Sequence, residues 1–138
     1  MDRKPILRVT AKIFMPFILL FGLYVQIHGD FGPGGGFQAG VIFASSFILY
    51  ALIYSLHDAK LVLSSVALEI MAAIGVLLFA GTGVVSFFYG ENFLNYNALA
   101  HDPIHGQHYG ILIIELGVGL TVFSAMTLIF YTFAGRGR

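Results

Sequence analysis

Four long apolar runs constrain the fold of this chain more than any other feature of its sequence. They cover about residues 9–27, 38–56, 62–88 and 110–134 of the 138 residues. The hydrocarbon core of a bilayer is about 30 Å thick, and a helix needs roughly 20 apolar residues to cross it. Each run meets that length. The sequence therefore predicts an all-α integral membrane protein with four transmembrane helices, forming a single membrane domain over residues 1–138.

Composition excludes several other classes of protein. The chain is 58% hydrophobic and 10% charged, whereas soluble domains carry about a quarter charged residues. A soluble fold of this size could not hide so much apolar surface in one core. There is no cysteine, and the formal net charge is zero. Disulfides and thiolate metal sites are therefore excluded, and nothing in the charge points to nucleic acid as a partner.

The positions of the basic residues predict the orientation in the membrane. All seven lie before or early in the first run, in the second connection, or after the last run: Arg3, Lys4, Arg8, Lys12, Lys60, Arg136 and Arg138. In a chain with four spans these segments share one side of the membrane. Basic residues mark the cytoplasmic side. We therefore predict an N-in/C-in topology, with the connections that begin at His28 and Tyr89 outside.

Three ionisable side chains fall within the apolar runs: Lys12, Glu69 and Glu115. Such groups are costly in hydrocarbon, so they usually face protein or water and often mark ion routes. At 1.5 Å per residue, Glu69 lies about 12 Å from the inner end of its span and Glu115 about 8 Å from the outer end, so their heights differ by about 10 Å. We predict all three as ion-pathway residues. Two staggered carboxyls could pass on a cation or proton if their helices face each other across water.

Other roles remain open for these three residues. Glu69 and Glu115 could instead pair structurally with neighbouring helices, or stay protonated because burial disfavours their charged form. The Lys12 side chain is long enough to reach the lipid headgroups, or it could pair with Glu69.

Small residues recur at four-residue spacing on the second and fourth runs. The two ridges are Gly36/Gly40/Ala44 and Gly117/Thr121/Ala125. Small residues let helix backbones approach closely in membranes. We therefore expect these ridges to pack against partner proteins.

Residues 28–38 form an unusual glycine-rich connection, His-Gly-Asp-Phe-Gly-Pro-Gly-Gly-Gly-Phe-Gln. So many glycines exclude an ordinary helix. A phosphate-binding loop is also excluded because no Gly-Lys-Ser/Thr follows. Two interpretations remain: a tight hairpin facing solvent, or irregular backbone buried in protein or lining a water cavity. In the second case the free N–H groups that start the next helix would favour a carboxylate or another anion.

The connection also carries a family resemblance. It resembles the signature of the B subunit of Mrp-type (Mnh, Sha) multisubunit sodium/proton antiporters, through His28, Pro33, Gly34, Gly35, Gly36, Phe37, Gln38 and Gly40. Ala39 stands where the family more often has glycine. The resemblance implies a small subunit in the bacterial cytoplasmic membrane, with other antiporter subunits and lipid as partners. It also implies that the complex transports Na+ and H+.

The third connection contains His101, His105 and His108, with Asp102 beside them. Three imidazoles and a carboxylate could hold zinc. We expect Pro103 and Gly106 to interrupt any helix that would bring the imidazoles to one face, so we predict no metal site. The open alternatives are a solvated loop that docks on a neighbour and a pH sensor.

No catalytic triad, cofactor motif or metal cluster is evident, so we predict neither enzymatic activity nor a cofactor. Two rival functions remain beside the antiporter subunit with an ion pathway. One is an assembly scaffold that conducts nothing. The other is the same module within an ion-pumping membrane hydrogenase or a complex I-like complex. Loss of transport without loss of assembly would separate a pathway subunit from a scaffold.

Overall fold

The computed structural model describes residues 5–29, 32–99 and 102–136, and within them every regular element is helical. These elements are α1 (Pro5–Ile27), α2 (Gly36–Tyr54), α3 (Leu56–Val62), α4 (Ser65–Phe88), the 3-10 turn η1 (Tyr96–Leu99) and α5 (Pro103–Gly135). The helices α1, α2, α4 and α5 are long and apolar enough to cross a membrane. The predicted all-α fold with four membrane spans is therefore confirmed, while the N-in/C-in orientation stays a prediction.

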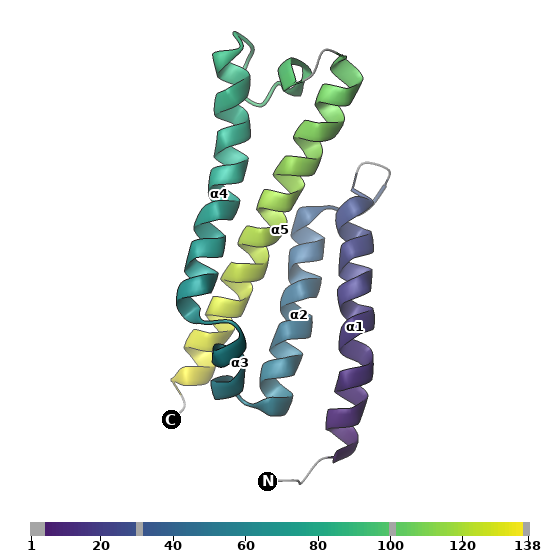
Figure 1. The fold of residues 1–138 in the computed structure, drawn as a ribbon, viewed down its shortest axis with the longest axis vertical. Coiled ribbons are helices and arrows are strands. Elements are labelled where there is room, and N and C mark those ends of the chain that lie inside the picture. Colours follow the sequence, from purple (N-terminus) through teal and green to yellow (C-terminus); the bar gives the residue numbers. More distant parts are fainter. Residues whose placement is uncertain (1–4, 30–31, 100–101, 137–138) are drawn as a thin grey trace.

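The four long helices stand in a row, in the order α4, α5, α2, α1 (Figure 1). The packing follows that order, because α5 contacts both α4 and α2, and α1 packs mainly on α2. Helix α1 begins and α5 ends at the same end of the bundle (Figure 1). At the other end, α4 and α5 extend beyond the connection between α1 and α2 (Figure 1). The glycine-rich connection thus lies beside the middle of α5 and not beside its end.

Small residues bring α5 close to both of its neighbours. A Cβ atom added to Gly40 of α2 would lie 2.6 Å from the carbonyl oxygen of Gly119. One added to Gly75 of α4 would lie 2.6 Å from the carbonyl oxygen of Gly117. Backbones that approach this closely leave no room for a side chain. The prediction that both ridges serve partner proteins was wrong for these positions, because they close helix contacts within the chain.

The second connection, which the sequence presents as a polar break, contains the short helix α3. Ser55 caps it by accepting a hydrogen bond from the Asp58 N–H at 3.1 Å. The hydroxyl of Tyr131 on α5 donates to the carbonyl oxygen of Leu63 at 2.9 Å. Ala59 and Tyr131 belong to the buried cluster at this end of the bundle. The connection from α2 to α4 is therefore packed against the end of α5.

Candidate functional site

The carboxyl group of Glu115 lies against the backbone of the glycine-rich connection. A Cβ atom added to Gly29 would collide with both carboxyl oxygens of Glu115, and one added to Gly35 would lie 2.9 Å from Oε1. An alanine at Gly29 would therefore displace the Glu115 carboxyl from its position in this structure. Helix α5 thus places the ionisable side chain of Glu115 next to the glycine-rich connection between α1 and α2.

The backbone at this point is bent in a way that glycine permits. Gly35 has φ of 110°, a conformation that other residues rarely adopt. Its N–H donates to the carbonyl oxygen of Val25 at 3.0 Å, which ties the start of α2 to the end of α1. Gly36 packs directly on the α5 backbone, since an added Cβ atom would lie 2.9 Å from the Gly119 nitrogen. This part of the connection is buried in protein, as the second interpretation of the motif expected.

Most other residues of the motif are more exposed than Gly35 and Gly36. His28 is half-buried and stacks on Tyr24 with ring centroids 5.0 Å apart. Pro33, Phe37 and Gln38 are exposed, Gly34 is half-buried, and Gly40 is buried against α5. Asp30 lies outside the described residues. The motif therefore has a buried glycine part that receives Glu115 and an exposed part that faces away from the chain.

The start of α2 provides a favourable environment for a negative charge. Among the described residues no side chain caps this helix, and its first turn holds no acidic residue. The first N–H groups of a helix lack partners within it and carry a partial positive charge. The Glu115 carboxyl lies next to Gly35, the residue directly before α2. The helix end therefore stabilises a carboxylate that comes from another helix.

Glu69 is not part of this site. It is exposed on α4, whereas Glu115 faces the connection between α1 and α2. Gly75 of α4 packs on α5 between Gly117 and Thr121. At 1.5 Å per residue, Glu69 lies about 9 Å below that contact and Glu115 about 6 Å above it. The chain therefore holds its two membrane carboxyls about 15 Å apart in height on different faces, and a path through both needs groups from elsewhere.

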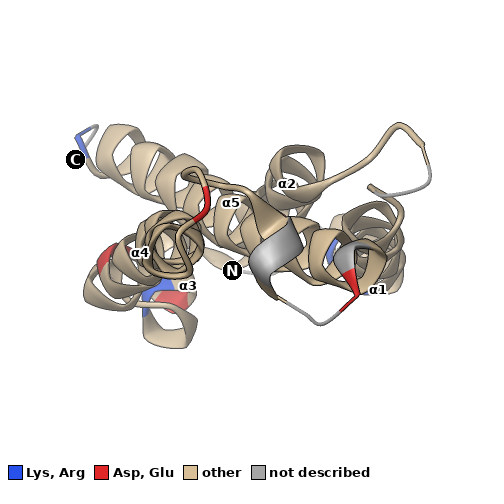
Figure 2. Cartoon of the chain, turned by 90° about the horizontal axis from the view of Figure 1, so that it is seen from above, with Lys and Arg blue, Asp and Glu red and all other residues tan. Residues whose placement is uncertain are grey.

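Lys12 is also remote from the Glu115 site. It is exposed on the second turn of α1. Helices α1 and α4 stand at opposite ends of the row (Figure 1). The view from above also shows α1 and α4 on opposite sides of the bundle (Figure 2). Few residues of the described helices are charged in this view. The fold therefore separates Lys12 from Glu69 within this chain.

The outer histidines lie differently from the sequence prediction. Helix α5 starts at Pro103 and runs through Gly106, so the expected interruption was wrong. Proline is tolerated in the first turn, where its missing N–H has no partner to lose. Asp102 caps the helix by accepting from the Ile104 N–H at 3.1 Å, and its other carboxyl oxygen lies 3.0 Å from Nδ1 of exposed His105.

The remaining histidines do not complete a metal site in the part of the chain that the structure describes. His108 lies one turn after His105 on α5 and is exposed, while His101 lies outside the described residues. Within residues 5–29, 32–99 and 102–136 there is no group of three or more side chains placed to hold a metal ion.

Gln26 is a buried polar residue that the sequence-based predictions omit. Its side chain is 7% exposed, and its Nε2 atom has no hydrogen-bond partner among the described residues. Its Oε1 atom would lie 2.6 Å from a Cβ atom added to Gly119, one turn of α5 from Glu115. A polar residue near the end of an apolar run resembles an ordinary helix end, so its burial could not be predicted from the pattern of residues.

Comparisons with known proteins identify the family. A family model described as a domain related to the MnhB subunit of Na+/H+ antiporter matches residues 6–128. The chain belongs to this MnhB family. It is 36% identical over 139 positions to mnhB2 of Staphylococcus haemolyticus (strain JCSC1435), with 97% of this chain and 96% of that protein covered. It is 33% identical, with the same coverage, to mnhB2 of Staphylococcus aureus (strain Newman).

Both relatives carry names that designate antiporter subunits. This MnhB-family protein is therefore a small subunit of a multisubunit Na+/H+ antiporter, and the other subunits of that complex are its partners. It is a multi-pass bacterial membrane protein of a transporter family. The resemblance on the glycine-rich motif is thereby confirmed.

Gly29→Ala is expected to impair ion exchange without preventing assembly. The added methyl group would occupy the place of the Glu115 carboxyl, while no helix contact is disturbed, because Gly29 lies after the end of α1. Combining Gly29→Ala with Glu115→Asp shortens the acidic side chain and should restore part of the exchange. The measurement is Na+-dependent exchange in membrane vesicles, normalised to the amount of assembled complex.

Gly32→Ala is the matched control for Gly29→Ala. It lies in the same connection, but among the described residues its added Cβ atom would meet only His28, at an ordinary distance of 3.5 Å. We expect near wild-type exchange from this variant. Equal losses in both variants would show that the connection is merely intolerant of alanine.

Proposed function

We propose that this MnhB-family subunit places Glu115 in the ion path of the antiporter complex. The observation that carries the proposal is the contact between the Glu115 carboxyl and the glycines that precede α2. An ionisable group within a membrane span is costly. The carboxyl group of Glu115 nevertheless packs against the backbone of Gly29 and Gly35 in the same chain. This contact supports a functional role for Glu115 more strongly than the presence of a polar residue in a membrane span would by itself.

The chemistry of the site suits a carboxyl group that changes its state during transport. The N-terminal end of α2 stabilises the carboxylate, and the carboxyl can also take up a proton or lie beside a passing cation. The glycines leave backbone groups near it without side chains to block access. Partner subunits would supply the rest of the path, because Glu69 lies on another face of this chain.

The roles of the other two pathway residues depend on their surroundings in the complex. Exposed Glu69 on α4 would contribute only if a neighbouring subunit covers it. The proposal keeps the N-in/C-in orientation, which puts Lys12 at the cytoplasmic side and the glycine-rich connection nearer the outer side.

An assembly role accompanies the proposed ion path. Large apolar side chains are exposed along α1 and α4, among them Phe17 and Phe87, which are 64% and 69% exposed. Lipid or other subunits would cover them. The named relatives are antiporter subunits, which favours an antiporter over a hydrogenase or complex I-like assembly as the setting of this chain.

Carbodiimide labelling of the whole complex would test the proposed position of Glu115. A hydrophobic carbodiimide reacts with protonated carboxyls, and mass spectrometry of the digested subunit reports Glu115 and Glu69 separately. A Na+ ion passing close to Glu115 favours its charged form. We therefore expect labelling of Glu115 to fall several-fold when Na+ replaces choline at constant pH and ionic strength. Labelling of Glu115 that is equal in both media would overturn the proposal.

A further inference from the structure

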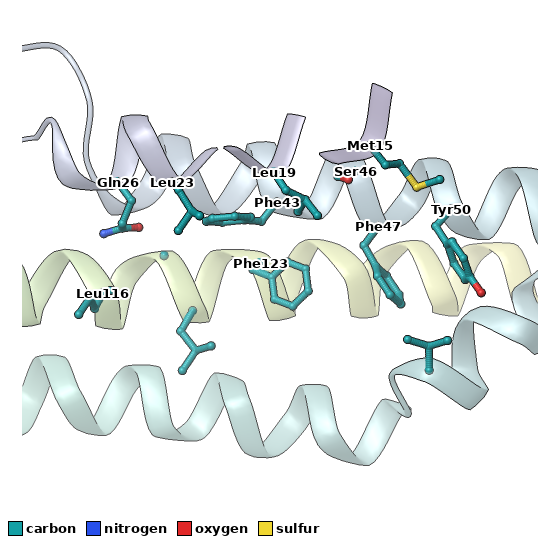
Figure 3. A pocket seen from close by; sticks show the side chains of 13 residues that line it. Met15, Leu19, Leu23, Gln26, Phe43, Ser46, Phe47, Tyr50, Leu116 and Phe123 are labelled. Atoms are coloured by element: carbon teal, nitrogen blue, oxygen red, sulfur yellow. The ribbon is translucent and has the colours of Figure 1, made fainter. Parts of the chain in front are cut away.

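An apolar groove runs along the bundle between α1, α2 and α5, and it is distinct from the contact of Glu115 with the glycines. Its volume is about 510 Å³. Side chains from all three helices point into it (Figure 3), among them Met15, Leu19, Leu23, Phe43, Phe47 and Phe123. Gln26 closes one end of this groove (Figure 3). The lining is otherwise almost entirely apolar, so the groove suits a hydrocarbon occupant.

The face of α1 that lines the groove continues into two basic residues. At 100° per residue, Met15, Leu19, Leu23 and Gln26 fall within an arc of about 80° around the helix. Lys12 and Arg8, which come three and seven positions before Met15, fall within the same arc. The groove therefore ends in positive charge at the N-terminal end of α1.

Aromatic residues of α2 hold one of these basic residues at the mouth of the groove. The Arg8 guanidinium carbon lies 5.7 Å from the centre of the Tyr54 ring. Tyr54 packs on Tyr50, with ring centroids 4.7 Å apart, and Tyr50 lines the groove. The Arg8 side chain thus places a delocalised positive charge at this end of the groove, and such a charge attracts a phosphate group. Lys12 is exposed beside this mouth.

The length of the groove matches one leaflet of a bilayer. From Met15 to Gln26 the helix rises about 16 Å, and the hydrocarbon of one leaflet is about 15 Å thick. The basic residues then lie at the depth of the headgroups, and the apolar lining lies at the depth of the acyl chains. Length, polarity and charge thus agree with a single kind of occupant.

We propose that this groove binds an anionic phospholipid, with an acyl chain along α1 and the phosphate at Arg8 and Lys12. The lipid fills the space between α1 and α5 beside α2. The proposed phosphate position lies at the opposite end of α1 from the glycine-rich connection, and the inference does not depend on the role of Glu115.

Photolabelling of the purified complex tests this proposal. The probe is phosphatidylglycerol with a diazirine in its acyl chain, and the labelled peptides of this subunit are mapped by mass spectrometry. We expect labelling between Met15 and Gln26 that excess phosphatidylglycerol suppresses and excess phosphatidylcholine does not. The double variant Arg8→Gln/Lys12→Gln should lower this labelling on the order of tenfold, because each basic group contributes to the attraction of an anionic headgroup.

Matched variants separate a specific site from general contact with lipid. Lys60→Gln removes a basic residue that lies on α3, over the ring of Tyr131, and not on the face of α1 that carries Arg8 and Lys12, so labelling should persist. Leu19→Trp should block labelling by filling the groove. Leu20→Trp, on an exposed part of α1 that does not line the groove, should not.

Two results would overturn the lipid site. One is labelling of the groove that is indifferent to the headgroup and to Arg8 and Lys12. The other is efficient crosslinking from a reagent at Leu19→Cys to another subunit without lipid labelling, which would show that a partner helix occupies the groove. The amount of assembled complex, measured for every variant, identifies any loss that comes from misfolding.

Discussion

Glu115→Gln is expected to lower Na+/H+ exchange at least tenfold in a complex that still assembles. The amide keeps the size of the carboxyl group, so the contact with Gly29 and Gly35 is preserved. It cannot carry a negative charge or exchange a proton, which are the properties that an ion path requires. The measurement is Na+-dependent dissipation of a pH gradient in everted vesicles from antiporter-deficient cells that express the complete complex.

Glu69→Gln is the control variant for Glu115→Gln. Glu69 is the other carboxyl within a membrane span, but it is exposed on α4 and lies on a different face from the glycine-rich connection. We expect a smaller loss of exchange from this variant. Normal exchange by assembled Glu115→Gln would exclude Glu115 from the path, and normal exchange by both assembled variants would leave the chain as a scaffold.

The membrane spans could be predicted from sequence because the bilayer sets their length and polarity. The predicted runs 38–56 and 110–134 correspond to α2 (Gly36–Tyr54) and α5 (Pro103–Gly135). The largest difference is at the start of α5, which begins seven residues before the predicted run. Its first turns carry His105 and Gln107 and extend beyond the apolar stretch, so hydropathy alone could not detect them.

The candidate site was only partly predictable. The cost of a carboxyl in hydrocarbon singled out Glu115, and the glycine pattern singled out the connection before α2. Their contact joins residues about 80 positions apart and depends on how α5 is rotated. That rotation is set by close packing, since Gly117 faces α4 while Glu115 and Gly119 face the α1–α2 side. Sequence periodicity on a helix that is apolar all round could not reveal it.

Gly75→Ala is expected to be the most destabilising single substitution considered for this chain. An added Cβ atom would collide with the Thr121 side chain and would lie 2.6 Å from the carbonyl oxygen of Gly117 and 2.9 Å from the Thr121 nitrogen. A side chain can rotate away, but two backbone atoms of α5 cannot. Overpacking of this kind typically costs about 1–3 kcal/mol and more where backbone must move. We expect about 3 kcal/mol here, and a several-fold lower amount of the subunit in membranes.

Gly81→Ala on the same helix provides the control, because an added Cβ atom there meets no heavy atom of the described part of the chain within 4 Å. Alanine also favours helix over glycine by about 1 kcal/mol, so this variant should accumulate at least as well as wild type. The measurement is the amount of subunit in membranes and its detergent-solubilised thermal stability. Adding Thr121→Ala to Gly75→Ala should recover only part of the loss, since the Gly117 carbonyl still obstructs the methyl group. Full recovery, or equal accumulation of Gly75→Ala and Gly81→Ala, would show that α4 and α5 do not pack as closely as these glycines indicate.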